Sequence, residues 1–204
     1  MSYEPLPDSE LAAVVTYLEM HNAPAVEVPA SPLRLRRIER PDLASYRELF
    51  RLVGAPWLWF SRLIMSDEKL AEIIHDENVE LFAVEDQSGR DAGMLELDFR
   101  EPGQCELAFI GLVPELSGKG HGRWLLAEAV NRAWGGGVSR VHVHTCSLDH
   151  PAALPAYRRA GFTPYRRAIE RFPDPRRLGI LAADCAPQVP LLGTDGSASA
   201  RPAS

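Results

Sequence analysis

The chain has 204 residues, of which 46% are hydrophobic, 25% charged and 8% aromatic, a composition typical of soluble globular proteins that argues against disordered, fibrous and membrane classes. The length suits one domain with appendages, because a domain usually takes about 100–200 residues. The formal net charge is −6, so we expect neither nucleic acid nor an anionic membrane surface as a partner.

Cysteine usage and the N-terminus indicate the compartment. Cys105, Cys146 and Cys185 show no CxxC spacing, which argues against a disulfide framework and a structural zinc site. The N-terminus carries acidic residues where a secretory signal carries basic ones, and its apolar stretch 11–15 is short. No later run reaches the length that spans a bilayer. We therefore expect a cytoplasmic protein with reduced thiols.

The first third of the chain predicts an arm, a strand and two helices. Residues 1–30 are rich in proline and acidic residues around one strand-like stretch, so we expect an appended arm or strand. Alternation over residues 33–38 predicts a strand, and a helix should begin near Asp42. Residues 54–56 break that helix, and a second helical pattern runs from Trp57 to Ile74, restarted by the cap-like residues 66–68.

Three strand-like runs follow, over residues 79–85, 92–100 and 106–113. The short turns between them predict an antiparallel meander. The glycine-rich segment 118–122 then leads into an amphipathic helix that ends at the glycines 135–137.

The remaining pattern predicts a strand over residues 139–146, a short helix over 151–160 and a last strand over 165–172. From residue 182 to 204 the chain consists mostly of Ala, Pro, Ser and Gly, with little to bury. We expect a disordered tail there.

Gly118, Gly120 and Gly122 alternate between a predicted strand and a helix N-terminus. Unhindered backbone N–H groups and the positive end of a helix dipole meet at such a point, which favours an anion such as phosphate. The GxGxG spacing differs from the GxGxxG of dinucleotide folds and from a P-loop. A strand-to-helix turn without a ligand is the alternative.

The order of the elements resembles the GNAT family of acyl-CoA-dependent N-acyltransferases over most of residues 33–172. The family's pyrophosphate pattern is Gln or Arg, two residues, Gly, one residue, then Gly or Ala. It maps onto Ser117, Gly120 and Gly122, with serine in place of the long side chain. Residues 153–162 are similar to the family's late helix, AxxxYxxxGF. The pattern TCxLDHPAALPxYxxxGF further resembles a bacterial branch whose members mostly lack an assigned substrate.

The resemblance implies an α/β (α+β) GNAT acyltransferase domain over residues 31–181, with a mixed, mostly antiparallel central sheet flanked by helices. It implies acetyl-CoA as co-substrate and a homodimer. Family members splay the strand before the glycine loop from the next strand to admit the coenzyme. The coenzyme-binding positions that it implies are Leu112, Val113, Ser117, Gly118, Lys119, Gly120, His121, Gly122, Arg123 and His150.

Acyl transfer to an amine needs a base for the amine and an acid for the departing thiolate. Tyr157 stands at the family's general-acid position, and a phenol with a pKa of about 10 is neutral at pH 7. Glu106 lies at the offset of a catalytic glutamate in the histone-acetylating branch. Strand alternation groups Glu106 with Ala108, Ile110 and Leu112, where desolvation would raise its pKa. A solvated strand-end glutamate is the alternative.

Other side chains compete for roles in the site. Glu96 and Asp98 share one strand face and are rival bases, a wall that attracts cations, or a salt-bridged surface pair. Trp57 and Trp59 fall in the segment that lines the acceptor cleft in relatives, where they form an aromatic wall or pack in the core.

The strand residues His142, His144 and Cys146 alternate on one face. Three neighbours along one strand are poorly arranged for tetrahedral coordination, so we interpret the histidines as structural and expect no metal. Cys146 has no nucleophile motif of its own.

The sequence thus predicts an N-acetyltransferase that moves an acetyl group from acetyl-CoA directly to a primary amine in a ternary complex, with Glu106 as base and Tyr157 as acid. A noncatalytic acyl-CoA-binding or assembly module is the alternative, since Ser117 replaces the family's Gln or Arg. A longer acyl-CoA donor is a third possibility. The amine acceptor, a small molecule or a protein, stays open, although the negative charge favours cations.

Overall fold

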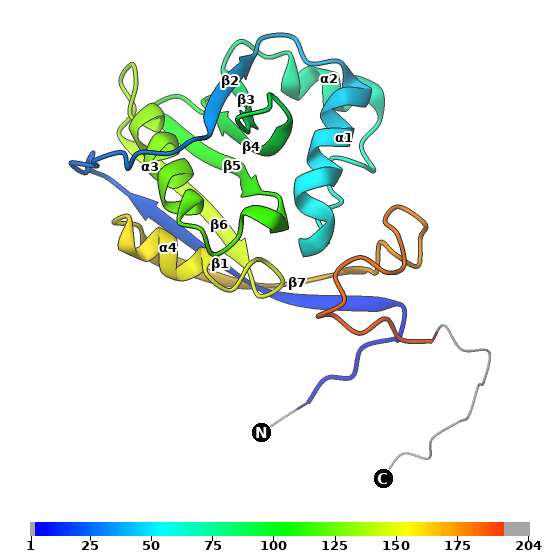
Figure 1. Ribbon diagram of the computed structural model, residues 1–204. Helices are drawn as coiled ribbons and strands as arrows, with labels where there is room; N and C mark the ends of the chain where they lie inside the picture. Colours follow the sequence, from blue (N-terminus) through cyan, green and yellow to red (C-terminus); the bar gives the residue numbers. More distant parts are fainter. Residues whose placement is uncertain (1–2, 194–204) are drawn as a thin grey trace.

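The computed structural model describes residues 3–193 and contains a seven-stranded sheet in the order β2-β3-β4-β5-β6-β1-β7 (Figure 1). Neighbouring strands pair antiparallel, except that β5 and β6 are parallel. The predicted mixed, mostly antiparallel sheet is confirmed. The elements are β1 Glu10–Met20, β2 Arg34–Ile38, α1 Leu43–Gly54, η1 Ala55–Trp57, α2 Asp67–Ile74, β3 Val79–Glu85, β4 Asp91–Asp98, β5 Gln104–Leu112, η2 Pro114–Leu116, α3 His121–Ala133, β6 Arg140–Cys146, α4 Ala153–Arg159 and β7 Thr163–Pro173.

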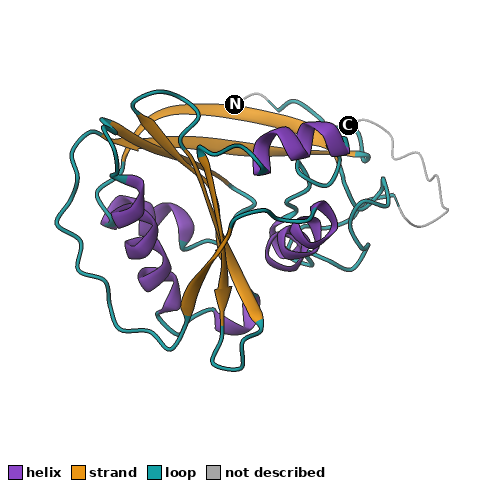
Figure 2. Cartoon of the chain, turned by 90° about the horizontal axis from the view of Figure 1, so that it is seen from above, coloured by secondary structure: helices purple, strands orange, loops and turns teal. Residues whose placement is uncertain are grey.

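The sheet separates two hydrophobic cores, and Figure 2 shows helices on both of its sides. On one face α1 and α2 bury residues such as Tyr46, Phe50 and Leu70 against β3 and β4. On the other face α3 and α4 bury residues such as Leu125 and Tyr157. We call these the α1 face and the α3 face. No helix within residues 3–193 has the length and apolar character needed to cross a membrane.

The N-terminal strand is an interior strand of the sheet. β1 pairs with β6 on one side and with β7 on the other, and Figure 1 shows β1 and β7 running side by side. Leu18 and Met20 join the core on the α3 face. The appended strand expected within residues 1–30 therefore joins β6 to the edge strand β7.

The second helix is shorter than its sequence pattern predicted. A 3₁₀ turn occupies residues 55–57, Leu58 takes a left-handed conformation with φ +59°, and α2 begins only at Asp67. The Ser66 hydroxyl accepts a hydrogen bond from the Lys69 N–H and caps α2, so the predicted helix restart at residues 66–68 is confirmed. The apolar residues of the connection fill two different cores, because Leu58 packs with Leu181 while Trp59 packs against the α1 face.

Residues 182–193, which the sequence assigned to a tail, pack against the domain. Ala186 is 1% exposed and shares a small core with Leu58 and Leu181. The buried Arg176 guanidinium donates hydrogen bonds to the carbonyls of Cys185, Ala186 and Val189. The rest of the predicted tail, 194–204, lies outside the described residues.

A parallel seam joins the two halves of the sheet over a short distance. β5 and β6 pair over Gln104–Glu106 and Arg140–His142, whereas β5 continues to pair with β4 as far as Leu112. Beyond Glu106 the two strands separate. The split that the family resemblance implied is present.

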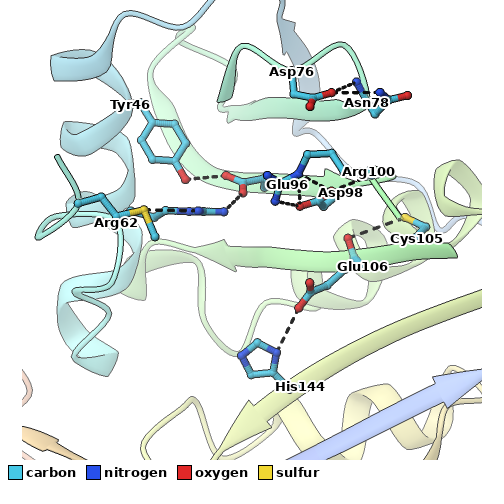
Figure 3. A network of polar contacts seen from close by, with 11 residues as sticks. Tyr46, Arg62, Asp76, Asn78, Glu96, Asp98, Arg100, Cys105, Glu106 and His144 are labelled. Carbon is cyan, nitrogen blue, oxygen red and sulfur yellow. Dashed lines mark hydrogen bonds and ion pairs between the residues drawn. The ribbon is translucent and has the colours of Figure 1, made fainter. Parts of the chain in front are cut away.

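A buried ion pair fixes the α1 face against the sheet. The Glu96 carboxylate is 0% exposed and accepts hydrogen bonds from Tyr46 Oη and Arg62 Nη2, both at 2.6 Å (Figure 3). Burial and the neighbouring carboxylate raise the pKa of Tyr46. Burial disfavours the charge on Arg62, but Glu96 outweighs it and raises the pKa of the guanidinium. Glu96 is thus a structural residue in this geometry.

Replacing Arg62 by Met should strand the Glu96 carboxylate in the core. Removing one partner of a buried ion pair costs about 3–5 kcal/mol, so the free energy of unfolding in urea should fall by that amount. The control is Arg90→Met, which breaks the exposed pair with Asp86 and should cost about 1 kcal/mol or less. Equal losses in the two variants would contradict this view of Glu96.

Candidate active site

A cavity of about 1250 Å³ follows the split between β5 and β6. On the α3 face its walls come from the glycine loop, α3 and α4. On the α1 face they come from residues 57–62, the ends of β4 and β5, and β7. Glu106 and His144 lie where the two parts meet. The split therefore connects one face of the sheet to the other.

The glycine loop forms the mouth of the cavity on the α3 face. Gly118 and Gly120 have φ of +74° and +83°, a left-handed conformation that favours glycine. A Cβ at either position would meet no atom of the described chain within 4 Å, so the loop backbone is open. Within residues 3–193 no side chain caps the N-terminus of the 13-residue helix α3. Its free N–H groups and dipole suit a phosphate.

Most of the implied coenzyme-binding residues gather around this mouth. The ones that line the cavity are Leu112, Ser117, Gly118, Gly120, Gly122, Arg123 and His150. Within residues 3–193, Val113, Lys119 and His121 lie outside the lining. The Val113 N–H donates to the Ala92 carbonyl, so its backbone belongs to the β4 side of the split.

Glu106 occupies the last paired position of the parallel seam. Its Oε1 lies 3.3 Å from Nδ1 of His144, and the two side chains face each other in Figure 3. The hydrogen bond from His144 outweighs burial and lowers the pKa of Glu106. The same contact raises the pKa of His144. The expected rise in the carboxyl pKa is wrong, because a histidine interpreted as structural is its partner.

A β-bulge changes the face on which Glu106 lies. The pairing of β4 with β5 shifts between Glu96 and Leu97, which leaves Ala108 without an opposite residue. Directly paired residues share a face, so Glu106 and Phe109 lie with Asp98 and Glu96 on the α1 face. Ile110 and Leu112 instead pack in the core of the α3 face. The predicted alternation from Glu106 to Leu112 is therefore wrong after the bulge.

Asp98 lies at the cavity but is held by a neighbour. Burial raises its pKa, yet hydrogen bonds from Arg100 outweigh this and lower it. Arg100 Nε lies 3.0 Å from each carboxylate oxygen. Of the three acidic residues on this face, Glu106 stands nearest to the split, since it forms the end of the seam.

Tyr157 on α4 lines the cavity from the α3 face and is 8% exposed. Its ring packs edge-on against Phe162. Burial, aided by the negative charge of Asp149, raises the pKa of the phenol. Tyr157 therefore keeps its proton at neutral pH, as a general acid must.

Asp149 is a site residue that sequence reasoning missed. Its carboxylate accepts hydrogen bonds from Trp59 Nε1 at 3.1 Å, Thr145 Oγ1 at 2.7 Å and the Cys146 N–H at 2.8 Å. It thus ties the acceptor-side connection to the turn that leads into α4. An aspartate three residues after a strand end is a signal for such a side-chain-to-backbone turn.

Trp57 and Trp59 each line the cavity and also pack against neighbouring residues. Trp59 lines the cavity and also packs tightly, since a Cβ on Gly54 would lie 2.5 Å from its side chain. Trp57 lines the cavity with its ring edge-on to His150, at a centroid distance of 5.0 Å. Both therefore shape the wall between the glycine loop and the α1 face.

Cys146 also lines the cavity, but its thiol is poorly suited to attack. Burial and the charge of Asp149 raise its pKa to about 11. The thiol is therefore protonated at neutral pH, and only a thiolate is an effective nucleophile. Among residues 3–193, no three Cys, His, Asp or Glu side chains come together in a way that would hold a metal ion.

Residues 46–162, more than half of the chain, match the model of the Acetyltransferase (GNAT) family. The chain belongs to this family. Membership indicates an acetyltransferase. The glycine loop, Glu106 at the end of the seam and Tyr157 all line one cavity of this GNAT protein.

Solved structures agree on the fold. A GCN5-related N-acetyltransferase from Sphaerobacter thermophilus has 20% identity and a TM-score of 0.52. The match covers 79% of this chain and 51% of that chain, so this chain spans about half of its length. An IAA acetyltransferase from Bacillus cereus has 25% identity and a TM-score of 0.50, and the match covers 66% of this chain and 79% of that chain. A spermidine N-acetyltransferase from Vibrio cholerae has 23% identity and a TM-score of 0.51, and the match covers 73% of this chain and 98% of that chain. No curated protein matches this chain.

The contact between Glu106 and His144 predicts a linked titration. In Glu106→Gln the imidazole pKa of His144, followed by NMR, should fall toward or below its ordinary value of about 6.5, because the hydrogen bond is lost while burial remains. The pKa of His142 should fall as well, because burial lowers it and the charge of Glu106, which opposes burial there, is lost.

The same pair should make stability depend on pH. Its contribution should fade as pH falls through the lowered pKa of Glu106, and again as pH rises through the raised pKa of His144. An unchanged His144 titration in the variant would contradict the contact.

Proposed function

We propose that this GNAT protein transfers an acetyl group from acetyl-CoA directly to a primary amine. The observation that carries the proposal is the cavity that passes through the split between β5 and β6. The glycine loop, whose open backbone suits a phosphate, lines it on one face of the sheet, and the Glu106 carboxylate lines it where the strands part. A donor and an acceptor that enter from opposite faces would meet within the split.

The donor half fits acetyl-CoA. Free N–H groups from the loop and the start of α3 would hold the pyrophosphate, and Arg123 adds a positive charge beside them. Ser117 offers only a short hydroxyl where the family has Gln or Arg, so the backbone carries most of this contact. In the described chain, the β6-facing edge of β5 is unpaired beyond Glu106. Its peptide groups are free to hydrogen-bond the amides of the pantetheine arm.

Glu106 and Tyr157 supply the proton transfers. The amine gives up a proton to the Glu106 carboxylate, its nitrogen bonds to the acyl carbon, and the carbon–sulfur bond breaks. The departing thiolate takes the proton of Tyr157, whose raised pKa has kept it protonated until then. The lowered pKa of Glu106 keeps it ionised, so it is free to accept the proton that the neutral amine loses as its nitrogen bonds to the acyl carbon.

Direct transfer is favoured over an acyl-enzyme. Cys146 lines the cavity, and the pKa of its thiol is raised to about 11. The thiol would need a base of its own to become a nucleophile. The homodimer and the cytoplasmic location expected from the sequence stay predictions.

Purified protein should release CoA thiol from acetyl-CoA only when a suitable amine is present, and mass spectrometry should find the amine acetylated. The assay compares amine classes against amine-free hydrolysis, with coenzyme binding measured by calorimetry. Binding of acetyl-CoA without amine-dependent release across the panel would favour the noncatalytic module. Faster release from a longer acyl-CoA would change the donor and leave the reaction type intact.

Tyr157→Phe should lower kcat by about 10²- to 10⁴-fold, because the thiolate loses its proton donor, while the Kd for acetyl-CoA changes little. Tyr165→Phe, which alters an exposed tyrosine on β7, is the matched control and should keep full activity. Wild-type turnover by Tyr157→Phe, with single-turnover kinetics showing that transfer limits the rate, would assign the acid elsewhere.

A further inference from the structure

An alkylamine that reaches the cavity as an ammonium must lose two protons before it becomes an amide. With a pKa of about 10, like that of lysine, the ammonium is its main form at neutral pH. An ammonium has no lone pair with which to attack the acyl carbon. In the proposed reaction Glu106 accepts only the proton that the neutral amine loses during the attack. The first proton therefore needs a second acceptor in the same cavity.

His144 lies beside Glu106 and has a free ring nitrogen. Its side chain lines the cavity, and its Nδ1 lies 3.3 Å from Oε1 of Glu106. In the neutral imidazole, a proton on Nδ1 is donated to this carboxylate and the lone pair lies on Nε2. Within residues 3–193 Nε2 makes no hydrogen bond or ion pair, and Figure 3 shows it on the side of the ring away from Glu106. The contact thus leaves His144 with an open proton acceptor.

The charges around His144 suit it to hold a proton. The titratable groups that face it are Glu106 on β5, Asp149 after β6, Glu170 on β7, Tyr17 on β1, and His142 and Cys146 beside it on β6. The three carboxylates, chiefly Glu106 through its hydrogen bond, outweigh burial and raise the pKa of His144 above its ordinary value. A base works best when its pKa lies near the working pH.

Resting on the proposed function, we propose that His144 is a second catalytic base, which takes the first proton from the acceptor ammonium before Glu106 takes the second. One N–H bond of the ammonium breaks and its electron pair stays on the nitrogen. The proton bonds to the lone pair of His144 Nε2, and the neutral amine then attacks the acyl carbon.

The proton balance of the reaction agrees with two bases. An ammonium and a thioester give an amide, a thiol and one released proton. The His144 side chain is 49% exposed, so it is able to pass that proton to water. The proton on Glu106 replaces, through water, the one that Tyr157 gives to the thiolate. All three side chains thereby return to their starting states.

The test compares two acceptors of nearly equal shape in His144→Gln. One is the alkylamine that the amine panel identifies, and the other is its analogue with fluorine atoms on the neighbouring carbon, which is largely neutral at pH 7. Glutamine keeps an N–H donor for Glu106 but cannot take up a proton at this pH. At pH 7 kcat/KM should fall by about 10²-fold or more for the alkylamine and by less than about threefold for the fluorinated amine.

The pH profile gives a second readout. In the wild type, kcat/KM for the alkylamine should rise with pH and level off above the raised pKa of His144, because the site itself deprotonates the ammonium. In His144→Gln it should continue to rise, about tenfold per pH unit, toward the pKa of the free amine. Only amine that is already neutral reacts in that variant.

The matched control is His21→Gln, which changes an exposed histidine outside the cavity lining as described. It should keep both rates and the wild-type profile. If His144 only positioned Glu106, glutamine would either preserve that role or lower the rates for both amines alike. The fluorinated amine therefore separates proton transfer from support of Glu106.

The two proposals fail in different ways. Equal losses for both amines in His144→Gln, or no loss for either, would overturn the role of His144 and leave the acetyltransferase proposal standing. So would a wild-type profile that rises as far as the pKa of the free amine. Acetylation of no amine by the wild type, with acetyl-CoA bound, would overturn the proposed function and the role of His144 with it.

Discussion

The short parallel seam between β5 and β6 is the constraint on which the rest of the molecule depends. Three paired residues on each strand hold it, and beyond Glu106 the strands part. Unpaired backbone N–H and C=O groups are costly unless water or a ligand satisfies them. The seam stays open because each strand is secured from its other side, β5 by β4 and β6 by β1.

Each half of the sheet is stabilised independently, which keeps the width of the split constant. On one half the buried Glu96, Tyr46 and Arg62 contacts fix α1 and the connection after it to β4. On the other, Asp149 holds the turn after β6 and reaches across to Trp59. That indole hydrogen bond links the two halves beyond the seam, so Tyr157 on α4 and Glu106 on β5 keep a defined separation.

Much of the fold could be predicted from local patterns, whereas the electrostatics of the site depended on pairing. Strand alternation and turn residues located most of the strands, and the glycine spacing located the start of α3. The bulge at Ala108 is a property of the β4 and β5 register, which no single-strand pattern reveals. Likewise His144 is 38 positions after Glu106, and only the parallel register brings them together. The apolar residues within 57–66 predicted a helix that the structure does not contain, because their side chains pack into two separate cores.

The interior position of β1 has a consequence for how the chain reaches its native state. The strand nearest the N-terminus finds both of its partners, β6 and β7, in the last third of the described chain. Such pairing has a high contact order, because it joins residues that are far apart in the sequence. The entropic cost of closing the long loop must therefore be met before the strand contacts stabilise the chain. During synthesis β1 must wait, unpartnered, until residues beyond 140 leave the ribosome. Until then its apolar residues, among them Leu18 and Met20, are exposed to other chains, which makes this strand a segment that a chaperone would protect.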